Sequence, residues 1–170
     1  MSRPVALLLV GLWLGLLVST WVMATVNFRK AEAASLAAGT PDELNRRLAP
    51  LSHDDRRHAF RYLAAEINRW MFRGFGLAQV GLGVLMVALV WRAGGSLRVL
   101  ALAALVLVLV QVGVLGPMIA SVGRQADFLA RPLPPDIARR FGIAHGGYVI
   151  VDLVKMAALA AISFVLIRRS

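Results

Sequence analysis

The stretch FGIAHGGYVIVDLVKMAALAAISFVLI, residues 141–167, decides what kind of protein this is. It is apolar enough to cross a bilayer, yet it carries Asp152 and Lys155 three residues apart. Charged side chains at bilayer depth cost about 2.5–3.5 kcal/mol each on insertion scales, so they face a bundle interior and mark a functional-site hypothesis. On a helix that turns about 100° per residue, both charges share one face with His145 and Tyr148. That face is too polar to point at lipid.

The composition of the whole chain indicates an integral membrane protein. Of its 170 residues 59% are hydrophobic, and the mean hydropathy is +0.71. The net charge of +10 comes almost entirely from arginine, because Lys30 and Lys155 are the only lysines. These arginines lie between apolar runs, where phospholipid headgroups are the expected partner and nucleic acid is not. Without cysteine the chain has no disulfide, thiolate nucleophile or iron–sulfur cluster.

Four apolar stretches are each long enough to cross about 30 Å of hydrocarbon as a helix. They cover approximately residues 5–25, 71–91, 97–120 and 146–167, and polar connections fill residues 26–70 and 121–145. The sequence therefore predicts an all-α integral membrane four-helix bundle, one membrane domain over residues 1–170. Pro117 should kink or end the third span. The first stretch has a second interpretation, a secretory signal cleaved after Ala24, because it follows a basic residue and ends in small side chains.

The longer connection contains an amphipathic, membrane-proximal helix that leads into the second span. Ser52 is a typical N-cap with Asp55 three residues later, and no helix breaker follows until Gly74. An apolar stripe opposite basic side chains predicts a helix on the membrane surface or against the end of the bundle. One of its faces carries a secondary candidate site, formed by His58, Tyr62, Glu66, Arg69 and Arg73. Such a row can hold a metal or an anionic headgroup, but a solvated helix face has the same pattern.

Polar side chains from all four spans lie at a similar depth. Counted from the side of the two longer connections, these residues lie about five to nine residues into their spans, at 1.5 Å per residue. They are Ser19 and Thr20 in the first span, Gln79 in the second, Gln111 in the third, and Asp152 and Lys155 in the fourth. Helices of this kind most economically point their polar groups at one another. We therefore expect a polar pocket within one leaflet, lined by His145, Tyr148, Asp152, Lys155, Gln79 and Gln111. The alternative is structural, with the two amides bonding each other and Asp152 neutralising Lys155.

These features favour a protein that binds a lipid, an amphiphile or a small metabolite in the intramembrane pocket. Membrane lipids are its expected partners on the outside of the bundle. Two other functions stay open. A proton-coupled transporter would use Asp152 and His145 as a relay. A structural or assembly subunit would use Gly11, Gly15 and Ser19, because small residues at a spacing of four let a second copy or a partner membrane protein approach closely.

The residues do not favour an enzyme, and they indicate neither a catalytic group nor a metal site. His53 and His58 are five residues apart, unlike the spacing of four in an HExxH helix. A triad of Ser163, His145 and Asp152 fails because about 27 Å of helix separates the serine from the histidine. Haem would need two axial histidines at matched depth, which are missing, and no other cofactor is indicated.

The tryptophans of the first span, the amphipathic lead into the second and the motif FGIAHGG at residues 141–147 together resemble a known family. Its members are small four-span membrane proteins of unknown function from bacteria and eukaryotes. In that family a Phe and a His commonly open the last span, as Phe141 and His145 do here. The resemblance implies a four-span fold without an activity, and Asp152 and Lys155 have no counterpart in it.

Basic residues give the orientation. Thirteen lie on the two longer connections and five on the other side, excluding Lys155. The positive-inside rule therefore places the connections in the cytoplasm. The Arg-, Ala- and Leu-rich composition favours a GC-rich bacterium and its plasma (inner) membrane. The opposite orientation stays open, because the connections also hold eight of the nine acidic residues and a cleaved signal would leave the longer one outside.

Overall fold

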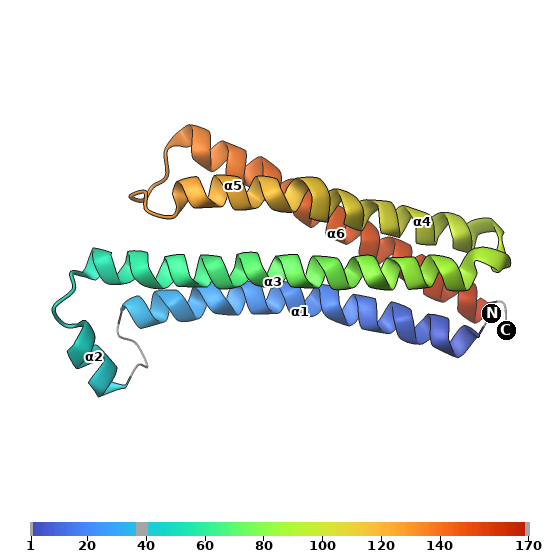
Figure 1. Ribbon diagram of the computed structural model, residues 1–170, viewed down its shortest axis with the longest axis horizontal. Coiled ribbons are helices and arrows are strands. Elements are labelled where there is room, and N and C mark those ends of the chain that lie inside the picture. The colour runs from blue at the N-terminus through green and yellow to red at the C-terminus, as the bar shows by residue number, and fades with distance from the viewer. Residues whose placement is uncertain (1, 37–40, 169–170) are drawn as a thin grey trace.

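The computed structural model describes residues 2–36 and 41–168, and nearly all of them are helical. Helix α1 spans Arg3–Ser35, the short helix α2 spans Asp42–Leu48, and helix α3 spans His53–Val90. The amphipathic segment is therefore not a separate surface helix, because it continues without a break into the second span. It packs instead against the second half of α1 (Figure 1).

A tight turn joins α3 to helix α4 (Gly95–Val110), through one 3₁₀ turn at Trp91–Ala93. Gly94 and Gly95 both have φ near +60°, at 61° and 56°, a conformation that glycine adopts at little cost and other residues avoid. The turn is short enough to make the second and third spans an antiparallel hairpin.

The third span does not end at its proline. A five-residue π-helical turn at Gln111–Leu115 separates α4 from helix α5 (Gly116–Ala126), and Pro117 lies in the first turn of α5. Proline has no amide hydrogen to donate and its ring crowds the preceding turn of an α-helix, so irregular turns are expected beside it. The wider π turn lies just before the proline, and the helical rod continues to Ala126, past the predicted boundary at residue 120.

The last helix, α6 (Pro135–Arg168), begins eleven residues before the predicted span and crosses the bundle from α5 toward α1 (Figure 1). α1 and α3 lie side by side, and the rod of α4 and α5 lies beside α6. Both longer connections lie at one end of the bundle. The start of α1, the end of α6 and the α3–α4 turn lie at the other. Within the described residues, four helical rods are long and apolar enough to cross a membrane, which confirms the all-α bundle and fits a multi-pass membrane protein.

The apolar core fills the half of the bundle that is distant from the longer connections. Its largest members include Trp13 and Met86, and α3 approaches closely there because Gly83 has no side chain. A Cβ atom at Gly83 would lie 2.9 Å from Leu105 Cδ1 and 3.0 Å from Trp13 Cη2. The core also contains Ala101 and Ala104 of α4 at zero exposure. Small residues therefore set the spacing of the helices in this half.

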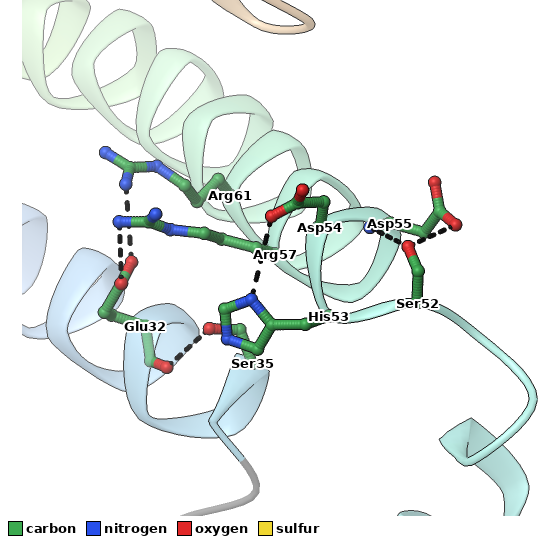
Figure 2. A network of polar contacts seen from close by, with 8 residues as sticks. All are labelled: Glu32, Ser35, Ser52, His53, Asp54, Asp55, Arg57 and Arg61. Carbon is green, nitrogen blue, oxygen red and sulfur yellow. Dashed lines mark hydrogen bonds and ion pairs between the residues drawn. The ribbon is translucent and has the colours of Figure 1, made fainter. Parts of the chain in front are cut away.

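Helix α1 is longer than the hydrocarbon core of a membrane is thick. α1 has 33 residues, about 50 Å of helix, whereas the hydrocarbon core is about 30 Å thick. The part of α1 that extends beyond the hydrocarbon lies at the end with the longer connections. There Glu32 of α1 pairs with Arg57 and Arg61 of α3 (Figure 2). Figure 2 also shows the predicted cap of α3, in which the Ser52 hydroxyl accepts the amide hydrogen of Asp55.

Candidate functional site

A buried polar network occupies the middle of the bundle, and it is centred on the two charges of α6. Lys155 Nζ lies 2.9 Å from Asp152 Oδ1, and their side chains are only 0% and 2% exposed. The same ammonium donates a hydrogen bond of 2.7 Å to Gln79 Oε1 of α3. Trp13 of α1 donates its indole N–H to that oxygen as well, at 3.1 Å. Lys155 is therefore both neutralised and hydrogen-bonded inside the membrane domain.

The carboxylate of Asp152 is held by two further donors. Gln111 Nε2, at the start of the π turn, donates to Asp152 Oδ1 at 2.9 Å and to the Tyr148 carbonyl at 3.1 Å. Trp21 Nε1 of α1 donates to Asp152 Oδ2 at 2.9 Å. The network thus joins all four long rods. Gln79, Gln111 and Asp152 meet as their depths predict, but α1 contributes Trp13 and Trp21 instead of Ser19 and Thr20, which take no part in these contacts.

The two amides do not bond each other, contrary to the structural alternative considered for them. Gln79 bonds to Lys155 and Trp13, whereas Gln111 bonds to Asp152 and the backbone. Gln111 Oε1 is buried without a hydrogen-bond partner among the described residues. A charged pair with this many direct partners is costly to disturb, and it fixes how the four helices meet.

The principal cavity lies next to this network, on the side of the longer connections. Its volume is about 580 Å³, and α1, α3, α5, α6 and the connection after α5 all contribute to its wall. Of the six pocket residues predicted from sequence, His145 lines it, but the other five do not. Tyr148 lies directly beneath, because its ring packs edge-on against Phe72 of the cavity wall with centroids 5.6 Å apart. A binding role for Asp152 and Lys155 thus stays a prediction.

The cavity wall has an apolar part and a basic part. Apolar side chains come from four helices and from the connection after α5, and they include Phe28, Phe72, Ile119, Leu133 and Phe141. The charged and titratable side chains are Arg57, Arg61, Arg69, Arg131, His58, His145, Asp54 and Asp127. Four guanidinium groups thus face the cavity beside two carboxylates, and an apolar surface adjoins them.

Arg69 is the most tightly paired of the four arginines. It contacts both carboxylate oxygens of Asp127, with Nη1–Oδ1 at 3.2 Å and Nη2–Oδ2 at 2.9 Å, and it also donates to Glu66. Nearby, the rings of Tyr62 and Phe128 stack with centroids 5.2 Å apart. These contacts hold the connection after α5 against α3 and so close one side of the cavity.

Arg131 has no such partner. No carboxylate among residues 2–36 and 41–168 lies within ion-pair distance of its guanidinium group. Although Arg131 is exposed, partial desolvation of its guanidinium group lowers its pKa, and the nearby Arg61 and Arg57 lower it further, whereas Asp127 acts in the opposite direction. Arg131 therefore lies in a locally positive field.

The secondary candidate face is divided by the structure. His58 and Arg69 line the cavity, Tyr62 and Glu66 support it through the contacts above, and Arg73 does not line it. No group of three or more His, Asp or Glu side chains that could hold a metal ion occurs in the described residues. His145 stacks on Phe141, with ring centroids 5.8 Å apart and planes at 7°. No hydrogen bond within the described part of the chain links His145 to the buried network.

No family model, curated protein or solved structure matches this chain. The similarity of Phe141 and His145 to a family pattern therefore carries no argument here, and the site is judged from its own geometry.

Several contributors to the site were not predicted from the sequence. Trp13 and Trp21 carry indole N–H donors inside an apolar span, and their spacing of eight puts them on the same face as buried Leu17. That combination signals a polar partner within the bundle. Arg131 offered no such signal, because it follows α5 in a connection whose path depends on the tertiary fold.

Proposed function

We propose that this protein binds a lipid or a similar amphiphile in the cavity beside the buried network. The proposal is supported by one observation above all: a single cavity has a basic part and an apolar part where the spans leave the hydrocarbon. His145 lines it within one residue of the predicted start of the last span. An amphiphile has the same two-part chemistry at the same depth.

The size of the cavity supports this function as well. A volume of about 580 Å³ falls within the roughly 300–1,000 Å³ that is usual for small-molecule sites. The apolar part of its wall is typical of such sites, and the eight charged or titratable side chains beside it suit the polar head of an amphiphile. The buried network beneath would act as a rigid floor, because Asp152 and Lys155 are already engaged by protein partners.

The test uses two matched glycine variants. Gly123 lines the cavity, and a Cβ atom there would lie 3.5 Å from Arg69 Nη1, so Gly123→Leu fills cavity space. Gly74 has no atom within 4 Å of an added Cβ, so Gly74→Leu is a control with the same chemical change. Native mass spectrometry of the detergent-purified proteins should show a bound mass on the wild type and on Gly74→Leu, and its loss from Gly123→Leu. Equal bound masses on all three proteins would contradict the proposal.

A role as an assembly subunit is the second candidate, and one observation favours it. Gly11 and Gly15 of α1 are exposed, with nothing within 4 Å of an added Cβ, and Ser19 is exposed too. The small-residue face therefore points away from the bundle, as helix docking requires. Gly15→Leu should then dissociate a complex that cross-linking detects in membranes, whereas Gly81→Leu on α3 should not.

We further place the protein in the plasma (inner) membrane of a bacterium, with both longer connections in the cytoplasm. The excess of basic residues on those connections supports this orientation. Cysteines introduced into the connection after α5 should react with a membrane-impermeant maleimide only after the cells are opened.

A further inference from the structure

We infer that the cavity holds the anionic head of its ligand, a phosphate or a carboxylate, at a cationic mouth formed by Arg57, Arg61 and Arg131. This inference rests on the proposed amphiphile binding and specifies the chemical class of the ligand.

The charges at the mouth are unbalanced. Arg57 and Arg61 share the single carboxylate of Glu32, with Arg57 Nη2–Oε1 at 2.9 Å and Arg61 Nη1–Oε2 at 3.3 Å (Figure 2). Arg131 contributes a third guanidinium and has no carboxylate partner in the described ranges. Three positive groups therefore face one negative group on this side of the cavity.

Glu32 does not itself line the cavity, and the two carboxylates that do, Asp54 and Asp127, do not correct this imbalance. Asp127 is only 8% exposed and is bound by Arg69 through two contacts, so its charge is already compensated. The Asp54 side chain is 85% exposed and lies 3.7 Å from His53 Nδ1, where water screens it strongly. A cationic headgroup would therefore meet repulsion at the mouth.

Unused hydrogen-bond donors point the same way. Arg57 Nε is buried and has no acceptor among the described residues, although the Nη2 group of the same side chain bonds to Glu32. This N–H has almost no exposed surface, so a ligand oxygen would satisfy it only after the Arg57 side chain turned toward the cavity, which would remove the cost of the missing partner. Guanidinium groups present their donors as a planar fork that matches the oxygens of phosphate and carboxylate.

The apolar part of the cavity wall favours an amphiphile over a free anion as the ligand. Phe28 and Phe72 belong to the same cavity as the arginines, and Leu133 continues this apolar surface beside Arg131. Inorganic phosphate would leave these side chains without a contact. A ligand with an anionic head and an acyl chain satisfies both parts of the wall.

The experiment compares two probes with the same acyl chain, lysophosphatidic acid and monoacylglycerol, with inorganic phosphate as a third. Binding to the full-length protein in a neutral detergent is followed by tryptophan fluorescence. Arg131→Gln is the test variant, since this arginine lies in an exposed connection. Arg92→Gln is the control, because it removes the same charge from an exposed site at the opposite end of the bundle.

Lysophosphatidic acid should bind at least about tenfold more tightly than monoacylglycerol, as expected for one or more charge-assisted hydrogen bonds. Arg131→Gln should weaken the binding of lysophosphatidic acid about tenfold and leave the affinity for monoacylglycerol unchanged. Arg92→Gln should change neither affinity. Equal affinity for the two amphiphiles, with both lost in Gly123→Leu, would overturn the anionic head and leave amphiphile binding intact. Failure of both to bind would overturn both proposals. Phosphate binding as tightly as lysophosphatidic acid would show a free-anion site instead.

Discussion

Removing one charge of the buried pair should damage the fold far more than removing both. Asp152→Asn would leave the ammonium of Lys155 buried at zero exposure, with Gln79 Oε1 as its remaining strong acceptor. Lys155→Met would leave a buried carboxylate, although Gln111 and Trp21 still donate to it. Breaking a buried pair typically costs about 3–5 kcal/mol, and the two retained donors place Lys155→Met at the lower end of that range.

The double variant Asp152→Asn/Lys155→Met contains no buried charge and nearly the same side-chain volume. Replacing both partners of such a pair is often close to neutral, so its loss should be no more than about 1–2 kcal/mol. The cycle should therefore give a coupling free energy of at least about 3 kcal/mol. The assay is unfolding in mixed micelles by titration with a denaturing detergent, followed by circular dichroism. Additive losses in the double variant would refute the reasoning, because they would mean that the two charges do not depend on each other.

Two further predictions concern packing and the paired arginines. Gly83→Leu should cost about 1–3 kcal/mol of unfolding free energy, because an added Cβ would come within 3.0 Å of Leu105 and Trp13, and Gly81→Leu, which enters open space, should cost little. A similar loss in both would exclude this explanation. Glu32→Gln should lower stability by less than about 1 kcal/mol, since its side chain is 38% exposed, and the effect should shrink in high salt. A salt-independent loss above about 2 kcal/mol would show that the pairs are stronger than their exposure indicates.

The bundle was predictable because its determinants are local in the sequence. Four apolar runs fix four helices, and the depth of Gln79, Gln111 and Asp152 in their runs fixes where they meet. The hydrogen-bond donors to Gln79 and Asp152 were not predictable. Trp13 and Trp21 reach these side chains only because of the way α1 packs against α3 and α6.

The cavity was harder still to predict. It exists because the connection after α5 folds back on α3 through two contacts, Arg69–Asp127 and Tyr62–Phe128. The two residues of each pair are 58 and 66 positions apart in the sequence, respectively. No periodic pattern in the sequence predicts a contact between residues so far apart. The basic face of the amphipathic segment was visible, but its role as a wall depends on α3 running straight along α1, and the position of Arg131 depends on that connection.

The placement of both charges on α6 has a consequence for biosynthesis. α6 follows the other three rods in the chain, so its partners on α1, on α3 and in the π turn after α4 leave the ribosome before Asp152 and Lys155 do. The insertion cost of these two charges is offset only when they reach those partners. Integration of α6 into the bilayer should therefore depend on the preceding helices being in place, and truncated chains that lack α1 should leave α6 poorly inserted and open to membrane quality control.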